Sequence, residues 1–421
     1  MKSVVRLALL SMLLILGISL LSATVAAYGA RYAGPTILVD LAHGENTRGL
    51  CTLFAVMPEA RWAVLVPSED YKLPECPVKP AEILVGDFAK VADKLKDFDM
   101  IIIGQPTRYL SQQEIEVLKQ WFHSIPGRVL WCAGDSDYPA QGGNQEIANH
   151  ACDALLAAIG SKLRLDFVSV EDTVSNAGRP YRVVGIVKPD PLYGAEVIAY
   201  GASKALFHGP GAVAWVDSAG KWHKLTEPNT PKNLVKIVVT TENGRIVEHQ
   251  PKQPGAPGEF GKAHRVGEQG VFVVMAAEVF EAGKGLPNIV IVSGETPYGG
   301  YQPMVTYRYH GVPLSGPRFV RNVILWALQY PAELGIASEI EKIVGSELSS
   351  AVKVAEEAAK NIASLEDKVD SLAREVRSLT EYMDSLNAGL GSIATIAYAS
   401  IGLAIVAIII AATAIALARK K

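Results

Sequence analysis

Residues 100–132, MIIIGQPTRYLSQQEIEVLKQWFHSIPGRVLWC, contain a complete strand–helix–strand unit. Residues 100–104 are a short run of apolar, mostly β-branched residues, which is typical of a buried strand. Ser111, with Glu114 three residues later, predicts a capping box at the start of a helix. A Pro-Gly pair ends that helix, and residues 128–131 predict the next strand. This order indicates a βαβ unit and therefore parallel strands.

The same alternation continues on both sides of this unit. Residues 36–40, 63–66 and 288–293 are short apolar runs that predict further buried strands. Residues 145–159 and 318–328 have the apolar spacing of helices. Strands that alternate with helices predict an α/β fold with a doubly wound, mostly parallel sheet and helices on both faces.

Residues 164–269 differ in character from the rest of this head. Short β-rich runs alternate there with Gly, Pro and Asn-Gly, which are typical of turns between strands. These runs occur at residues 183–187, 197–200, 212–216 and 234–240. We therefore expect a β-rich insertion in the α/β head, with residues 251–261 as a loop rich in Pro and Gly.

The C-terminal part of the chain carries two further patterns. In residues 362–390, apolar residues recur at alternating spacings of three and four, mainly β-branched at position a and Leu at position d. This heptad repeat favours a parallel two-stranded coiled coil, so residues 338–390 predict a stalk that forms a homodimer, with a trimer as the alternative. Residues 393–418 are apolar and long enough to span a bilayer as a transmembrane helix, and a basic tail follows at 419–421.

The N-terminus predicts export. Lys2 and Arg6 precede an apolar run that ends in small residues, which is the pattern of a signal peptide. Cleavage after Ala27 is favoured, which would remove residues 1–27, and an uncleaved anchor is the alternative. The basic tail belongs in the cytoplasm by the positive-inside rule. We therefore expect a single-pass protein of the cell membrane, with the lipid bilayer around its C-terminal helix, a cytoplasmic C-terminus and an extracellular head over residues 31–335.

The four cysteines, Cys51, Cys76, Cys132 and Cys152, all lie in the predicted extracellular head. An even number of cysteines in an oxidising compartment favours two disulfides. Proximity in the sequence favours the pairs Cys51–Cys76 and Cys132–Cys152, and reduced buried thiols are the alternative.

The charge and the motifs of the chain argue against several classes of protein. The formal net charge is −3, which gives no electrostatic basis for binding nucleic acid. Neither an H-E-x-x-H nor a C-x-x-C motif occurs in the sequence. We expect no nucleic-acid partner and no cofactor.

Polar side chains follow the predicted strands at their carboxyl ends, where doubly wound sheets bind ligands. The candidate ligand-binding residues are Asp40, His43, Glu45, Gln105, Thr107, Arg108, Asp135, Asp137 and Glu295. Asp40, Asp135 and Asp137 could give oxygen ligands to a hard cation such as Ca²⁺. Arg108, together with backbone amides, could hold a carboxylate or sugar hydroxyls. Alternatively, Asp135 and Asp137 only cap the loop and helix that follow them.

The order of these elements resembles the class I glutamine amidotransferase-like fold, in the non-catalytic branch found beside some membrane transport systems. The segments that carry the resemblance are IIIGQPTRYLSQQEIEVLKQW (101–121), RVLWCAGDSDY (128–138), IVIVSGETPY (289–298) and RFVRNVILWAL (318–328). They cover both ends of the head but not the β-rich middle. The resemblance implies an amidotransferase-like or flavodoxin-like head.

Enzymes of that family use a Cys at a strand-to-helix elbow and a His–Glu pair after a late strand. Cys132 lies at the end of a predicted strand, but Leu130 stands where the elbow needs a glycine, and no His adjoins Glu295. The resemblance therefore implies a head without catalysis.

We expect a membrane-anchored extracellular binding or interaction protein of the cell envelope, which presents a ligand to a transporter or another envelope partner. An exported Cys-dependent amidase or hydrolase that uses Cys132 is one alternative. A structural tether for a surface layer is the other.

Overall fold

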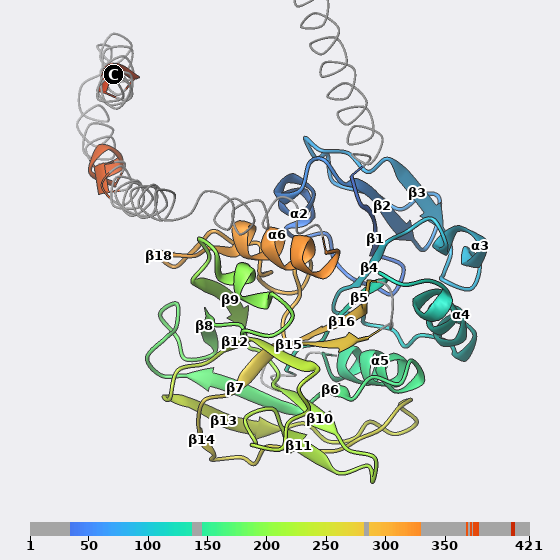
Figure 1. Cartoon of the computed structure of the whole chain (residues 1–421). Helices are drawn as coiled ribbons and strands as arrows, with labels where there is room; N and C mark the ends of the chain where they lie inside the picture. Colours follow the sequence, from blue (N-terminus) through green and yellow to red (C-terminus); the bar gives the residue numbers. More distant parts are fainter. Residues whose placement is uncertain are drawn as a thin grey trace, which may run out of the picture. The chain divides into compact units, whose positions relative to one another are not determined.

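A ten-stranded sheet with the order β3-β2-β1-β4-β5-β16-β15-β12-β8-β9 forms the centre of the head (Figure 1). Six neighbouring strands are parallel: β3 (Glu82–Val85), β2 (Arg61–Val66), β1 (Thr36–Asp40), β4 (Met100–Ile103), β5 (Val129–Ala133) and β16 (Asn288–Ser293). Four more continue the sheet with alternating direction: β15 (Val273–Phe280), β12 (Leu234–Val239), β8 (Arg182–Val187) and β9 (Lys204–His208). The predicted α/β fold with a mostly parallel sheet is confirmed.

The computed structural model describes residues 34–136, 145–281 and 286–329, and short helical stretches at 368, 371–372, 374–378 and 406–408. The chain divides into two compact units, Met1–Leu334 and Gly335–Lys421, and the head belongs to the first. The predicted signal peptide, residues 1–27, lies outside the described residues.

Helices cover both faces of the sheet, as the alternating pattern predicted. On one face lie α2 (Leu50–Val56) and α6 (Gly316–Ala327); on the other lie α3 (Ala92–Leu95), α4 (Gln112–Ser124) and α5 (Gln145–Ala158) (Figure 1). Side chains alternate along β1, so Ile37 and Val39 join the core beneath α2 and α6. Leu38, between them, joins the core beneath α4 and α5.

The unit β4–α4–β5 forms as the sequence predicted. The hydroxyl oxygen of Ser111 accepts a hydrogen bond from the backbone N–H of Glu114 (3.3 Å), and the carboxylate of Glu114 accepts one from the N–H of Ser111 (2.8 Å). This is a complete capping box, which satisfies two backbone donors at the start of α4. Because β4 and β5 are adjacent and parallel, their carboxyl ends meet at one edge of the sheet.

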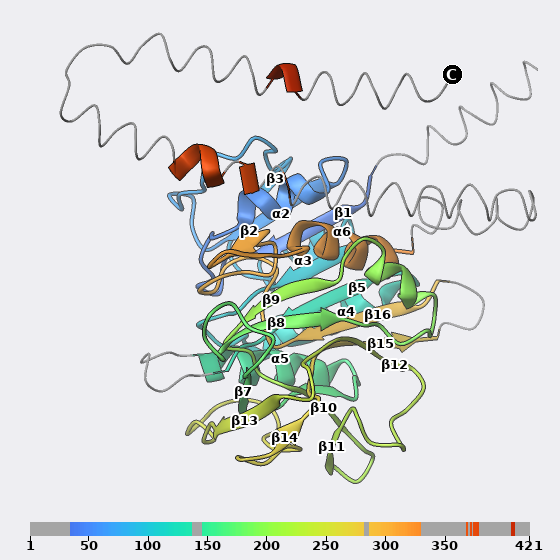
Figure 2. The ribbon, with the colours of Figure 1, turned by 90° about the vertical axis from the view of Figure 1, so that its left-hand side faces the viewer.

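Residues 164–269 do not form one separate insertion, because β8, β9 and β12 join the large sheet. The remaining strands form two three-stranded sheets, which lie at the lower end of the head in Figures 1 and 2. One contains β11 (Trp222–Lys224), β10 (Val213–Val216) and β6 (Leu163–Leu165), and the other contains β14 (Gln269–Gly270), β13 (Gly244–His249) and β7 (Val168–Asp172).

The β-rich run at residues 197–200 is not a strand. It belongs to a 3₁₀ helix, η2 (Ala195–Ala199), which packs on α6. The side-chain amide of Asn322 in α6 donates hydrogen bonds to the carbonyls of Ile198 (3.1 Å) and Tyr200 (2.9 Å). Asn322 of α6 thus supplies the hydrogen-bond donors that a neighbouring strand would supply if this segment lay in a sheet.

The parallel half of the sheet has the strand order β3-β2-β1-β4-β5. The flavodoxin order is 2-1-3-4-5, so the expectation of a flavodoxin-like order is wrong. The chain builds outward from β1 in one direction through β2 and β3, and then in the other through β4 and β5. The loops after β1 and β4 therefore diverge, and this is where doubly wound sheets open a crevice for ligands.

In the second unit, the described residues 371–372, 374–378 and 406–408 are helical. Most of the predicted coiled coil (338–390) and of the predicted transmembrane helix (393–418) lies outside the described residues, as does the basic tail at 419–421. No helix within the described part of the chain has the length and hydropathy of a membrane span.

Two disulfides link the head, and they are the predicted pairs. Cys51 at the start of α2 bonds to Cys76 in the loop between β2 and β3, and Cys132 in β5 bonds to Cys152 in α5. The paired cysteines lie 25 and 20 residues apart in the sequence. Each bond thus closes a short loop and restricts the unfolded chain.

We predict that replacing Cys132 and Cys152 together by Ala lowers the free energy of unfolding by about 3 kcal/mol, because the unfolded chain regains the entropy of an open loop of about 20 residues. Urea denaturation, monitored by circular dichroism, measures this loss. The Cys51→Ala/Cys76→Ala variant is the matched control and should lose a similar amount, because its loop has a similar length. An unchanged midpoint for the first variant would contradict the bond.

Candidate functional site

The crevice between the loops after β1 and β4 contains several of the predicted site residues. Asp40 is the last residue of β1, and His43 and Glu45 follow it; all three are buried. Gln105 follows β4 and is also buried. The backbone N–H of Thr107 donates to the carbonyl of His43 (2.9 Å) and joins the two loops.

His43 lies between two carboxylates. Its Nδ1 is 2.7 Å from the carboxylate of Asp40, and its Nε2 is 2.8 Å from the carboxylate of Glu114. The ring also stacks on Phe88, with 5.5 Å between the ring centres. The ion pairs connect the end of β1 to the first turn of α4, so the capping residue Glu114 also fixes the loop that follows β1.

The two neighbouring carboxylates keep His43 charged. Burial lowers the pKa of His43, but the charge of Asp40 and the hydrogen bonds to Asp40 and Glu114 outweigh burial and raise this pKa to about 11. Burial raises the pKa of Glu114, but its hydrogen bond with His43 and those with Ser111 lower it to about 2. At neutral pH both groups are ionised, and both ring nitrogens of His43 act as donors.

Glu45 and Tyr298 fill the rest of the crevice. Burial and the charge of Asp40 raise the pKa of Glu45 well above its usual range. The hydroxyl of Tyr298 donates to the carbonyl of Asp40 and accepts from the N–H of Gly104 (3.1 Å). A Cβ at Gly104 would lie 3.0 Å from this hydroxyl, so a larger residue there would have to displace the Tyr298 side chain.

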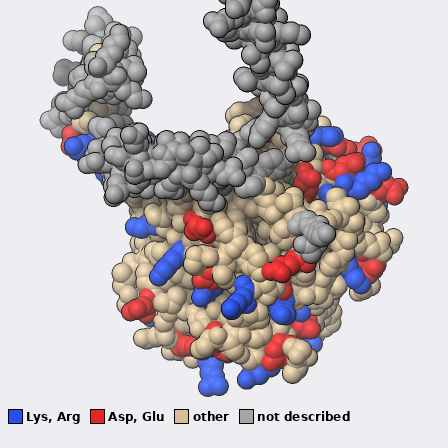
Figure 3. All heavy atoms as spheres, in the orientation of Figure 1, with Lys and Arg blue, Asp and Glu red and all other residues tan. Residues whose placement is uncertain are grey.

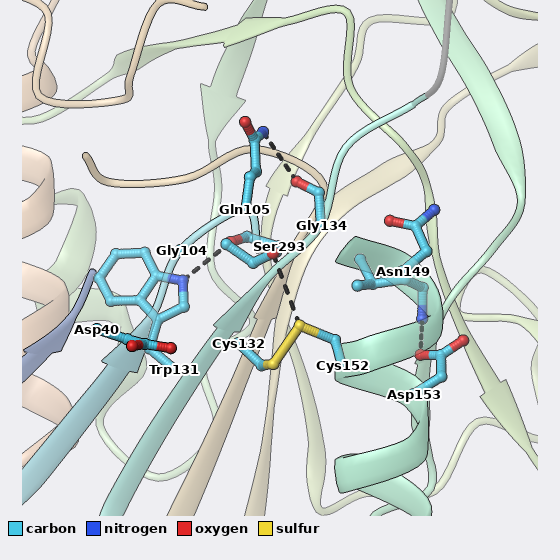
Figure 4. Close-up of a disulfide and its surroundings, with 12 residues drawn as sticks. Asp40, Gly104, Gln105, Trp131, Cys132, Gly134, Asn149, Cys152, Asp153 and Ser293 are labelled. Atoms are coloured by element: carbon cyan, nitrogen blue, oxygen red, sulfur yellow. Dashed lines mark hydrogen bonds between the residues drawn. A yellow bond between two sulfur atoms is a disulfide. The ribbon is translucent and has the colours of Figure 1, made fainter. Parts of the chain in front are cut away.

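A second polar cluster connects β4, β5 and β16 at the same edge of the sheet. The amide nitrogen of Gln105 donates to the carbonyl of Gly134 at 3.0 Å (Figure 4). It also donates to the carboxylate of Glu295 at 3.0 Å. Glu295 also accepts from the backbone N–H groups of Thr296 and His208, each at 2.8 Å. Burial raises the pKa of Glu295 to about 8, although these hydrogen bonds oppose the shift.

The Cys132–Cys152 disulfide lies below this cluster, between β5 and α5 (Figure 4). Both residues are fully buried, and the sulfur of Cys152 lies 3.6 Å from the carbonyl oxygen of Ala133. A disulfide sulfur has no thiolate electron pair, so Cys132 in this bond is not a nucleophile.

The other predicted site residues lie apart from the buried network. Thr107 and Arg108 are exposed, and Arg108 has no hydrogen bond or ion pair with another described residue. The Asp135 carboxylate accepts from the N–H of Ser136 (2.7 Å), which fits the expectation of a loop cap. Asp137 lies outside the described residues, so the Asp40, Asp135 and Asp137 metal set stays a prediction.

Within the described residues, Asp40, His43 and Glu45 bring metal-ligand atoms within 4.8 Å of one another. This group differs from the predicted set because His43 and Glu45 replace the two later aspartates. Both nitrogens of His43 already contact carboxylates, and a charged imidazole has no lone pair for a metal. The arrangement is that of a buried ion-pair network.

Sequence reasoning missed three residues of this site. Glu114 was assigned only to a cap, because its contact with His43 joins positions 71 residues apart. Tyr298 lies 258 residues from its partner Asp40. His208, at the end of β9, reaches Glu295 through its backbone, and its ring lies 4.6 Å from that of Tyr301. The sequence signal that marked Glu295, a polar residue at a strand end, applies equally to His208.

No protein-family model matches the chain, and no curated protein sequence matches it. Among solved structures, the chain is similar to one described as "mmIFT52 N-terminal domain", with 13% sequence identity and a TM-score of 0.41. The similarity covers 69% of this chain and 97% of that chain. A TM-score this low supports no conclusion about the fold or the function of this chain.

We predict that His43→Asn destabilises the head by about 3–5 kcal/mol at pH 7, because it leaves two buried carboxylates without their cation. The pH dependence of the free energy of unfolding is a second test of the charge on His43. The pKa of His43 is raised from 6.5 to about 11 on folding, so its contribution is full below pH 6.5 and is lost as the pH rises to 11. Between pH 8 and pH 10, the wild-type free energy of unfolding should therefore fall more steeply than that of the variant.

Urea denaturation at pH 8, 9 and 10 measures how steeply the free energy of unfolding falls with pH in wild type and in His43→Asn. The two slopes should differ by about 1.4 kcal/mol per pH unit. His223→Asn is the matched control, because that histidine forms two carboxylate contacts at the edge of the head, where solvent reaches its partners. Parallel slopes for wild type and His43→Asn would show that His43 is not charged in the folded head.

Proposed function

We propose that this chain is a membrane-anchored extracellular binding protein whose head carries out no catalysis. In this proposal the head belongs with the non-catalytic amidotransferase-like proteins, and it presents a ligand or a surface to an envelope or transporter partner. The observation that carries the proposal is the Cys132–Cys152 bond, because it occupies the strand end where the enzymes of that fold hold their nucleophile.

The two histidines at this edge of the sheet support the same conclusion. A catalytic histidine must exchange a proton near neutral pH, and the pKa of His43 is raised to about 11. His208 has the opposite shift: burial, with nearby cations, lowers its pKa to about 4. Neither imidazole is poised to act as a general acid or base at neutral pH.

The rim above the filled crevice offers groups that suit binding. Arg48 donates to the carbonyl of Tyr301, and its guanidinium lies 5.4 Å from the centre of the Tyr301 ring. Tyr301 is 58% exposed. An exposed aromatic ring next to a guanidinium suits a ligand with a carboxylate and an apolar face, and Arg108 adds a second cation on the neighbouring loop.

The sequence of the second unit supports the anchor and the stalk. Residues 393–418 have the length and composition of a membrane span. Leu372, at a d position of the heptad repeat, is 55% exposed in the single chain. An apolar side chain at such a position packs against a partner helix in a coiled coil, so we propose self-association through the stalk, with a dimer favoured over a trimer.

Thiol titration tests the absence of a nucleophile. The purified full-length protein in detergent should react with less than 0.1 equivalent of an aromatic disulfide reagent, both folded and unfolded in guanidinium without reductant. After reduction, four thiols per chain should react. A single fast-reacting thiol in the folded protein, lost in Cys132→Ala, would instead support the exported amidase.

Membrane fractionation tests the anchor. The full chain should stay in the membrane pellet at pH 11 in carbonate and move to the supernatant only with detergent, because an apolar span partitions into the bilayer. Protease added to intact cells should degrade the head. A matched variant that ends after Gln329 should be recovered outside the membrane fraction. Release of the full chain by carbonate alone would contradict the anchor.

A further inference from the structure

A groove with a volume of about 980 Å³ lies on the two small sheets and shares no residue with the polar network at the carboxyl edge. Its walls are β11 and the segment 262–268, which precedes β14, and the end of β13 contributes His249. Figures 1 and 2 show these strands at the lower end of the head, and Figure 3 shows both Lys or Arg and Asp or Glu side chains along that end.

Buried hydrogen bonds hold the wall of this groove in place. The carboxylate of Asp166, which is fully buried, accepts from the backbone N–H groups of Ala263 (3.0 Å) and His264 (2.9 Å). The same oxygen lies 2.7 Å from the ring nitrogen of His264. The ring of His249 donates to the carbonyl of His264 (2.9 Å). The segment is therefore fixed before any ligand binds, which lowers the entropic cost of binding.

Positively charged side chains outnumber negatively charged ones in the lining of the groove. Lys224 forms an ion pair with Glu268 across the groove, which neutralises both. Lys221, Lys262 and Arg265 are exposed, and none of them forms an ion pair with another described residue. Three cations thus face solvent in a preformed groove, although the whole chain has a formal net charge of −3.

The groove also contains an aromatic ring and a carboxylate. Trp222 lines the floor, and a Cβ at Gly261 would lie 2.1 Å from its indole nitrogen, so the glycine is required for this packing. Glu227 lies on the same wall as Lys224 and is 3.0 Å from the ring of His223. The groove therefore offers a ligand a hydrogen-bond acceptor and an aromatic side chain as well as three cations.

We propose that this groove binds an acidic oligosaccharide, whose carboxylate or sulfate groups pair with Lys221, Lys262 and Arg265. Sugar hydroxyls can donate to Glu227, and the apolar face of a sugar ring can contact the indole of Trp222. A groove of about 980 Å³ is far larger than a single inorganic anion and suits several linked sugar units. A uniformly acidic peptide fits less well, because it has neither hydroxyl groups to donate to Glu227 nor the apolar face of a sugar ring to contact the indole of Trp222.

The proposal goes beyond the membrane-anchored binding function and does not depend on it. The test uses the full-length protein in detergent and a fluorescein-labelled heparin hexasaccharide, which carries carboxylates and sulfates. We expect saturable binding, measured by fluorescence anisotropy, that weakens by at least tenfold in Lys221→Glu/Lys262→Glu/Arg265→Glu. Binding should also weaken as salt rises, because exposed charges are screened.

The matched control reverses three exposed lysines elsewhere in the head, in Lys94→Glu/Lys96→Glu/Lys188→Glu. This variant has the same net charge as the groove variant and should bind within twofold of wild type. Both variants change only exposed side chains, and equal thermal unfolding midpoints check that each is folded. Arg265→Gln alone should weaken binding severalfold without a charge reversal.

Competition experiments identify the ligand class. Neutral maltohexaose and inorganic sulfate should not displace the hexasaccharide at equal concentration, and poly-L-glutamate of similar length should displace it at least tenfold less well. Equal loss of affinity in the two charge-reversal variants would overturn the groove as the site. Equal competition by poly-L-glutamate would overturn the saccharide in favour of an acidic peptide. Loss of membrane anchoring would leave all of these outcomes unchanged.

Discussion

The head depends on one buried cation held between two carboxylates. Asp40 ends the first strand, Glu114 begins α4, and His43 connects them at 2.7 and 2.8 Å. Each of these charges alone would destabilise the core, but together they satisfy one another and fix the angle between the β1 loop and α4. Because Glu114 is also the capping residue of α4, the same carboxylate sets where the helix starts and where the loop lies.

This network explains how the carboxyl edge of the sheet is held together around the end of β1. Tyr298 and Glu45 occupy the space between the diverging loops, and Gln105 with Glu295 closes the next gap along the edge. The buried polar residues at these strand ends hold neighbouring elements of the fold together. Within the described residues, the exposed Tyr301 ring beside Arg48 and the groove on the small sheets are two surfaces that a ligand could reach.

The sequence predicted those features that depend on neighbouring residues. The capping box at Ser111, the strands at 36–40 and 288–293 and both disulfide pairs follow from local pattern or proximity. The 3₁₀ segment η2 could not be predicted, because its carbonyls are satisfied by Asn322, which lies more than a hundred residues away. The site was predicted as a set of residues at strand ends, but its closure by Tyr298 required the tertiary structure.

The two disulfides also bear on how such a head could be produced. The pairs follow one another along the chain: Cys51–Cys76 is complete before Cys132 is reached, and neither loop contains a cysteine of the other pair. If the chain emerged from its N-terminus, each cysteine would meet its native partner before the next pair appeared. Oxidation in order of emergence would then give the native bonds without any exchange between the two pairs.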